Sequence, residues 1–253
     1  MRVWLLIWLM VAGPVAAQSL TIATTGTFPP YLFEDGDRPS GFDIDLMDEI
    51  CAIHRFDCAY VIYPLREGLE AVANGHADIA LGGIGATVER EVYGSFTCPY
   101  RTSGSSSTPI FARDPDTDLS AARIAVMADT QSHAALVAEG YDAVPFVDLE
   151  SAIRSVLEGD TDAYHGNTNS LPLVPGAADQ LTIVGHIEDE TGGGVAFLVS
   201  RSNPRLLAIL NDSLGMLARD GRMQDIADIW FGEGGFAPPD DMSVTCGAML
   251  ARR

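Results

Sequence analysis

The sequence predicts an α/β fold made of two successive lobes. Short runs rich in β-branched and apolar residues alternate with amphipathic runs that have helical spacing, which is typical of βαβ units. This alternation ends near residue 83 and restarts near residue 122. A chain of 253 residues can bury one large core or two smaller ones. The restart of the pattern favours two modules, and therefore two lobes.

The first module is predicted to read strand, helix, strand, helix, strand. Its first helix places Phe42, Leu46 and Ile50 at helical spacing. Gly75 follows the second helix and is a suitable C-cap, because glycine readily adopts the left-handed conformation found there. The predicted elements are the strands 19–25, 58–64 and 77–83 and the helices 41–53 and 65–75.

The second module repeats this order and is followed by one more strand and two terminal helices. Gly140 is predicted to end its first helix, and its second helix carries Leu149, Ile153 and Val156 on one side. The predicted elements are the strands 122–130, 142–148, 161–166 and 192–200 and the helices 131–140, 149–159, 204–221 and 223–232.

The charge excludes several classes of function. The formal net charge is −20, and all 15 basic residues are arginines. Nucleic acid is an unsuitable partner, since phosphate binding needs a concentrated positive face. Because the sequence contains no lysine, catalysis through a lysine Schiff base and nucleotide binding by a P-loop are both excluded. The five histidines are scattered without ligand spacing, so the sequence predicts no metal and no cofactor.

The first 17 residues are predicted to be a secretory signal. Arg2 precedes an apolar run at 3–11, and Val15–Ala17 forms a cleavage site of small residues. A membrane anchor is the alternative, but the run is short for a bilayer and Gly13-Pro14 interrupts it. We therefore expect an exported, periplasmic chain that begins near Gln18.

Export permits disulfide bonds between the four cysteines. Cys51 falls late in a predicted helix and Cys58 at the start of the next strand, so a bridge would join these two elements. Two buried thiols are the alternative. The sequence leaves open whether Cys98 and Cys246, which are far apart in the chain, form a second bridge.

Several segments, read in order, resemble one protein family. They include GFDIDLMDEIC at 41–51, GIGATVER at 83–90 and SFTCPY at 95–100, with TFPPYLFE before them and DTQSHA and IADIWFG after them. This order resembles the periplasmic amino-acid-binding proteins of ABC importers, the polar amino-acid branch of the family-3 solute-binding proteins. The resemblance covers nearly the whole chain after residue 17.

The resemblance implies a type II periplasmic-binding-protein fold, in which two crossover strands form a hinge. Lobe 1 would comprise 18–98 and 195–253, and lobe 2 would comprise 99–194. The expected function is capture of an amino acid or related small carboxylate by closure of the cleft, without catalysis. The expected partner is an ABC permease of the inner membrane, and the protein is expected to be a monomer.

The resemblance also explains the position of Arg90. The segment T-x-E-R at 87–90 is predicted to start a helix, where a cation is disfavoured by the positive end of the helix dipole. In the family this arginine binds the carboxylate of the ligand, and a guanidinium offers the matching two-pronged geometry. A surface ion pair with Glu89 or Glu91 is the alternative.

Further ligand-binding positions follow from the resemblance, residue by residue. Phe28 would stack on the ligand, and Leu65 stands where many members have a second aromatic residue. Gly83, Gly85 and Thr87 would meet the ligand through backbone or hydroxyl groups. Thr130 and Gln131 would close on its carboxylate from lobe 2. Core packing for Phe28, and helix capping for the threonines, are the alternatives.

This chain departs from the family where a free α-amino acid places its ammonium group. It has Thr25 in lobe 1 and Asn167 in lobe 2 instead of carboxylates, and a buried ammonium without a counter-charge is costly. Either another acid serves, with Asp129 and the run 188–191 as candidates, or the ligand lacks a strong cation. His165 and Tyr164 would shape the pocket or pack in the core.

Two other functions stay open on the sequence alone. One is an exported enzyme on the same scaffold, similar to the cyclohexadienyl dehydratases, which would need a cleft acid near the leaving group. The other is an accessory or sensor domain.

Overall fold

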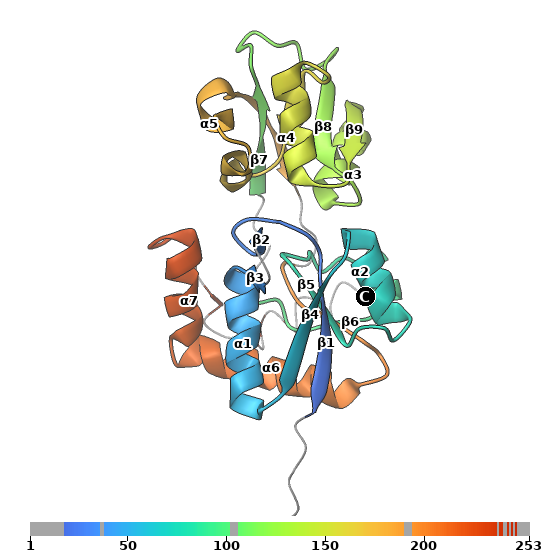
Figure 1. Cartoon of the computed structure of the whole chain (residues 1–253), viewed down its shortest axis with the longest axis vertical. Helices are drawn as coiled ribbons and strands as arrows, with labels where there is room; N and C mark the ends of the chain where they lie inside the picture. Colours follow the sequence, from blue (N-terminus) through green and yellow to red (C-terminus); the bar gives the residue numbers. More distant parts are fainter. Residues whose placement is uncertain are drawn as a thin grey trace, which may run out of the picture.

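The computed structural model describes residues 18–35, 38–101, 106–189, 194–236, 238–239, 242, 244 and 246. The predicted signal segment, 1–17, lies outside this part of the chain. The strands form two five-stranded sheets and one short hairpin. The two sheets with their helices lie one above the other along the long axis (Figure 1). Among the helices in the described part of the chain, none combines the length and the apolar character that a membrane span requires.

The first sheet combines an early and a late part of the chain. Its strand order is β4-β1-β5-β12-β6. β1 pairs in parallel with both β4 and β5, whereas β12 runs antiparallel to β5 and β6. The strands are β1 (Ser19–Thr24), β4 (Asp57–Ile62), β5 (Ile79–Leu81), β6 (Ser95–Phe96) and β12 (Leu198–Val199).

Helices cover this sheet and bury its apolar side chains. The helices α1 (Phe42–His54), α6 (Pro204–Arg219) and α7 (Arg222–Phe231) share one buried cluster with strand residues such as Ile22 and Ile79. The helix α2 (Leu65–Ala73) contributes Leu65, Leu69 and Val72 to another cluster. Figure 1 shows α1 and α2 on opposite sides of β1 and β4.

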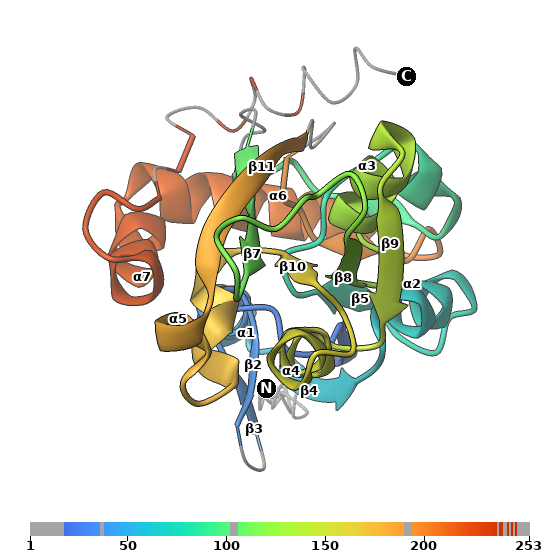
Figure 2. The same ribbon diagram turned by 90° about the horizontal axis from the view of Figure 1, so that it is seen from above.

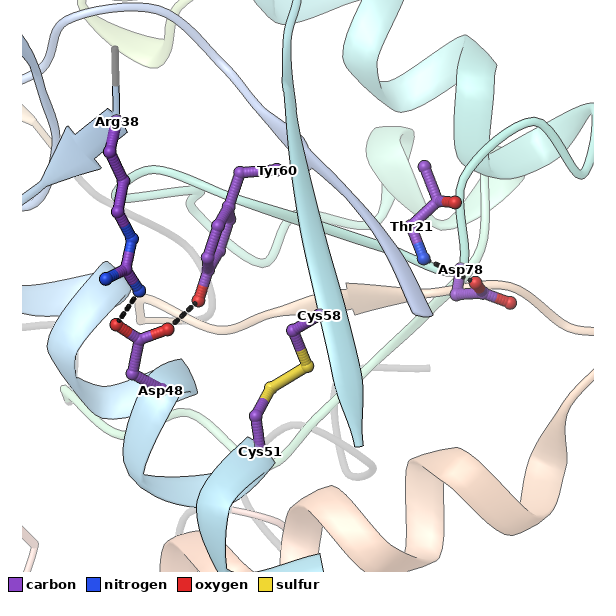
Figure 3. Close-up of a disulfide and its surroundings, with 7 residues drawn as sticks. All are labelled: Thr21, Arg38, Asp48, Cys51, Cys58, Tyr60 and Asp78. Atoms are coloured by element: carbon purple, nitrogen blue, oxygen red, sulfur yellow. Dashed lines mark hydrogen bonds and ion pairs between the residues drawn. A yellow bond between two sulfur atoms is a disulfide. The ribbon is translucent and has the colours of Figure 1, made fainter. Parts of the chain in front are cut away.

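A disulfide joins the end of α1 to the start of β4, between Cys51 and Cys58 (Figure 3). Next to it, Asp48 accepts a hydrogen bond of 2.7 Å from the Tyr60 hydroxyl and pairs with Arg38. Arg38 begins β3 (Arg38–Ser40), which pairs with β2 (Phe33–Asp35) as a hairpin. A second disulfide links Cys98, after β6, to Cys246.

The second sheet has the order β11-β7-β10-β8-β9. The strands β8, β9 and β10 are parallel and alternate with helices, as the sequence predicts. Thr130 caps α3 and Asp148 caps α4, and glycines with positive φ end both helices. The elements are β7 (Ser106–Ala112), β8 (Arg123–Met127), α3 (Gln131–Glu139), β9 (Asp142–Phe146), α4 (Leu149–Glu158), β10 (Ala163–His165), η2 (Thr168–Leu173), α5 (Ala177–Gln180) and β11 (Thr182–Asp189).

The strands β7 and β11 are absent from the sequence prediction, and two of the predicted elements take another form. In the described part of the strand expected at 192–200, which begins at residue 194, the strand is limited to the two residues of β12. The helix expected at Arg90 is a single 3₁₀ turn, η1 (Glu89–Val92). Gly94 follows it and lies so close to β12 that a Cβ there would be 2.7 Å from the Val199 carbonyl oxygen. The chain therefore turns into β6 instead of continuing as a helix.

The chain passes between the two sheets twice, and the two crossing segments are hydrogen-bonded to each other. The Tyr100 N–H donates to the Val195 carbonyl at 3.0 Å, and the Val195 N–H donates to the Arg101 carbonyl at 2.9 Å. Figure 2 looks along the long axis, and elements of both sheets lie over one another in that view. Paired crossings of this kind allow the two halves to rotate as units.

Candidate functional site

A cavity of about 640 Å³ lies between the two sheets. Its walls come from the segments that follow the carboxyl ends of β1, β5, β8 and β10, and from the crossing residues Arg101 and Val195. Ligands of α/β proteins bind in this place, because the ends of parallel strands leave a crevice there. The volume is in the range of small-molecule sites.

Arg90 reaches into this cavity from η1. Its Nη1 donates to the Gly85 carbonyl at 3.1 Å, and its Nη2 donates to the Asp129 carbonyl at 3.0 Å, so it touches both halves of the molecule. Burial lowers the pKa of Arg90, while the charges of Asp129 and Glu89 oppose this change. A largely buried guanidinium whose side-chain hydrogen bonds within the described residues go to carbonyl oxygens is suited to bind an anion.

The loop after β5 supports two aromatic rings. The rings of Phe28 and Tyr31 lie with their centroids 6.2 Å apart, above Gly83. Gly83 has a φ of +69°, and a Cβ there would be 2.9 Å from a ring atom of each. Glycine is therefore required for both its conformation and its lack of a side chain. The rings provide an apolar wall for a ligand.

Asp43 holds this loop from behind. Its carboxylate accepts the Gly82 N–H at 2.9 Å, the Gly83 N–H at 2.8 Å and the Tyr100 hydroxyl at 2.6 Å. Burial raises the pKa of Asp43 to about 6, although these hydrogen bonds act in the opposite direction. The side chain is fully buried and does not line the cavity.

The N-terminus of α3 meets the same loop from the second sheet. The Thr130 hydroxyl accepts the His133 N–H at 3.1 Å and donates to the Met127 carbonyl at 2.7 Å. The side chain of Gln131 packs on Gly85 so closely that a Cβ on Gly85 would lie 2.0 Å from its Oε1. The part of the cavity wall that follows β5 and the part formed by α3 are thus in contact at this point.

β10 and the residues after it form another part of the wall. The Nδ1 of His165 lies 3.1 Å from the Pro109 carbonyl oxygen. The Oδ1 of Asn167 is buried and has no hydrogen-bond partner among the described residues. A buried acceptor without a partner is costly, so a ligand donor at Asn167 would be favourable.

The cavity wall contains nine of the ten residues that the sequence suggests for ligand binding; they are Thr25, Phe28, Leu65, Gly83, Gly85, Arg90, Thr130, Gln131 and Asn167. Thr87 does not line the cavity. Its hydroxyl accepts the Arg90 N–H at 3.3 Å, so it supports η1. Thr25 lines the wall but donates its hydroxyl to the Leu81 carbonyl at 3.2 Å.

Two of the acids suggested as partners of an ammonium group, Asp129 and Glu188, do not line the cavity. Asp129 pairs with Arg66 at the rim, where both side chains are partly exposed, and it does not line the cavity. Glu188 is exposed on β11. The rest of the run 188–191 includes Glu190 and Thr191, which lie outside the described residues. Tyr164 is fully buried beside Phe111 and also does not line the cavity.

Sequence reasoning missed Arg101 and the aromatic residues around it. The Arg101 guanidinium carbon lies 5.9 Å from the Tyr31 ring centre, 5.6 Å from that of Phe231 and 5.8 Å from that of Phe236. It also donates a hydrogen bond to the Tyr31 hydroxyl. The one local signal is its place directly after the F-T-x-P-Y motif.

The described residues contain no group of three or more His, Cys, Asp or Glu able to hold a metal.

The fold is similar to that of solved periplasmic binding proteins. A His/Glu/Gln/Arg/opine family-binding protein from Silicibacter pomeroyi, in complex with lysine, superposes with a TM-score of 0.75 at 25% identity over 85% of this chain and 98% of that chain. An ancestral arginine-binding protein bound to glutamine gives a TM-score of 0.73 at 26% identity over 86% of this chain and 99% of that chain.

Two curated relatives from Escherichia coli have similar coverage. ABC transporter arginine-binding protein 1 is 26% identical over 232 residues, which are 87% of this chain and 93% of that protein. L-cystine-binding protein TcyJ is 23% identical over 225 residues, which are 85% and 83% of the two chains. The model of one protein family matches residues 20–233. This chain therefore belongs to the bacterial extracellular solute-binding proteins, family 3.

Proposed function

We propose that this protein is the periplasmic substrate-binding protein of an ABC importer and captures a small solute with a carboxylate group. The single observation that carries the proposal is Arg90, a desolvated guanidinium that lines a cavity between two sheets and contacts both halves. The similar relatives named as ABC transporter binding proteins support the same role. The ligand would be passed to a permease of the inner membrane, and the protein would act as a monomer.

The two lobes in this proposal are 18–98 with 195–253, and 99–194. Each contains one of the five-stranded sheets. The ligand carboxylate would lie on Arg90, with the apolar part of the ligand against Phe28. Contacts from both lobes favour the closed form, so binding energy is converted into hinge closure.

We propose binding without catalysis, and the similar relatives reported above are binding proteins. The enzymatic alternative requires a general acid in the cleft. The described residues that line the cavity include no Asp or Glu, although His165 lines it and is of a type that acts as a general acid. Incubation with prephenate tests this directly, because product formation would support a dehydratase instead.

Replacement of Arg90 by alanine tests the proposal. A charged hydrogen bond to a carboxylate contributes about 1.5–3 kcal/mol, so Arg90→Ala should weaken binding of every carboxylate ligand by about 10- to 100-fold. Affinity would be measured by calorimetry with any ligand that raises the melting temperature in a panel of small carboxylic acids. Small-angle scattering would measure whether the ligand makes the protein more compact.

The matched control is Arg113→Ala. Arg113 is exposed on the second sheet and lies away from the cavity, so its removal should leave affinity unchanged. Equal affinity of the wild type and Arg90→Ala would contradict the proposal, as would binding without any change in compactness.

A further inference from the structure

The cavity has an unusual charge for this chain. The protein carries 35 acidic residues against 15 basic ones. The described residues that line the cavity nevertheless include two arginines, Arg90 and Arg101, and no aspartate or glutamate. A positive, partly desolvated cavity inside an acidic protein selects against cations and for anions.

The two acids whose charges act on Arg90, Asp129 and Glu89, do not line the cavity. Asp129 is close enough to favour the charged form of Arg90, but its carboxylate pairs with Arg66 at the rim. Glu89 also acts on Arg90 from the exposed side of η1. Neither lines the cavity, so the inner face of the Arg90 guanidinium is available to a ligand.

Arg101 is held in an aromatic environment. The rings of Tyr31, Phe231 and Phe236 surround its guanidinium at 5.6–5.9 Å. Its hydrogen bond to the Tyr31 hydroxyl fixes its direction. Within the described part of the chain, Arg101 makes no ion pair. A guanidinium has five N–H donors, so those beyond the one that binds the Tyr31 hydroxyl can serve a carboxylate.

The buried acid near this region, Asp43, does not line the cavity and so is not placed to bind an ammonium group of the ligand. The carboxylate of Asp43 already accepts three hydrogen bonds, from Gly82, Gly83 and Tyr100. Of the other polar side chains on the wall, Asn167 and Thr25 carry no charge, and His165 can carry only a positive one. The buried Oδ1 of Asn167 accepts no hydrogen bond from the described residues, so it suits a neutral donor on the ligand.

Building on the proposed function, we propose that the cavity selects a small dicarboxylic acid without an ammonium group. One carboxylate binds Arg90 and the other binds Arg101, while Asn167 accepts a hydrogen bond from a hydroxyl of the ligand. Two carboxylates neutralise two guanidinium groups. The zwitterion of a basic amino acid would instead leave excess positive charge in a desolvated cavity.

Four related compounds test this by differing in one group each. Glutarate has two carboxylates, glutamate adds an ammonium group, 2-hydroxyglutarate adds a hydroxyl, and butyrate has one carboxylate. Calorimetry on the wild-type protein, refolded to remove bound ligand, should give glutarate at least about tenfold tighter binding than glutamate or butyrate. 2-Hydroxyglutarate should bind at least as tightly as glutarate. Arginine should not bind.

Substitution of Arg101 locates the second carboxylate. Arg101→Gln should weaken glutarate binding by about 10- to 100-fold and leave butyrate binding within about threefold. Arg101→Lys keeps the charge without the two-pronged geometry and should give an intermediate loss. It also supplies the comparison if the glutamine variant does not fold. The control is Arg113→Gln, which should bind all four compounds as the wild type does.

The outcomes separate this inference from the proposed function. Tight binding of arginine or glutamate that depends on Arg90 but not on Arg101 overturns the dicarboxylate assignment and leaves the proposed function standing. Loss of such binding in Glu190→Gln would identify the missing acid. Equal losses of glutarate and butyrate in both Arg101 variants would show a positioning role only and overturn the assignment. If no carboxylate binds the wild type, the proposed function fails and the inference fails with it.

Discussion

Asp43 shows how one buried acid fixes the geometry of the cavity. It receives the N–H groups of Gly82 and Gly83, and so holds this loop beneath the rings of Phe28 and Tyr31. Burial still dominates, and the pKa of Asp43 rises to about 6. The acid therefore titrates in a range where ordinary aspartates are already ionised.

This pKa predicts a specific pH dependence of stability. Because the folded-state pKa of about 6 is above the ordinary 3.8, folding favours the protonated form. The contribution is fully present below about pH 4 and is lost as the pH rises through about 6. Asp43→Asn should remove this decrease, which is on the order of 3 kcal/mol. Urea unfolding at several pH values would measure the difference between wild type and variant.

The control for this prediction is Asp212→Asn, a change at an exposed position of α6. It should leave the pH profile of the unfolding free energy as in the wild type. The prediction is wrong if Asp43→Asn and the wild type have parallel profiles between pH 4 and pH 7.

At the scale of elements, the junction of α1 and β4 is held covalently. The Cys51–Cys58 disulfide closes a short loop at the end of the first sheet where Cys58 pairs with Leu20, opposite the end that leads to Thr25 and the cavity. The Asp48 carboxylate adds contacts to Tyr60 and Arg38 at the same junction. This end of the lobe thus gains stability without contact to the ligand site.

The double variant Cys51→Ala, Cys58→Ala should reduce the free energy of unfolding by about 2–3 kcal/mol, because it restores the entropy of a short loop in the unfolded chain. Its affinity for ligand should be that of the wild type. Urea denaturation measures the first quantity and calorimetry the second. A loss of affinity with unchanged stability would assign the bridge to the site instead.

At the scale of the whole molecule, contacts across the cavity hold the two halves together. Gln131 lies on Gly85, Arg90 binds the Asp129 carbonyl, and Arg66 pairs with Asp129 at the rim. The last of these is an exposed ion pair, so its effect is small and is screened by salt.

Arg66→Gln should therefore speed ligand release by about two- to fivefold at low salt. High salt should abolish the difference from wild type, since it screens the pair in both proteins. Stopped-flow measurement of the dissociation rate provides the test. Arg154→Gln removes the exposed pair with Glu150 within α4 and should have no effect. An increase that persists at high salt would point to a packing role for Arg66.

The sequence predicts the parallel strands and their helices well, because caps and spacing are local signals. Thr130 and Gly140 bound α3 as expected. β7 and β11 were missed, since Pro109 lies in one and Gly185 shifts the register of the other. These residues break the alternation that identifies a strand.

The residues of the candidate site also fall into those that the sequence predicts and those that it does not. The residues of contiguous motifs, such as Gly83, Gly85 and Arg90, reach one cavity. Arg101 could not be assigned to the site from its neighbours in sequence. The rings that lie around its guanidinium, those of Tyr31, Phe231 and Phe236, are distant in the chain and approach it only in the folded molecule. The absence of carboxylates from the described cavity wall is likewise a property of the assembled molecule.

The path of the chain through the two sheets has a consequence for the order of folding. Every strand of the second sheet comes from Ser106–Asp189, so its hydrogen bonds can form as soon as that segment has been synthesised. The first sheet stays incomplete until β12 inserts between β5 and β6. A chain that folds as it emerges from its N-terminus would thus carry an open sheet edge at β5 from Leu81 until Leu198 is available, and during this interval a chaperone has a strand to protect.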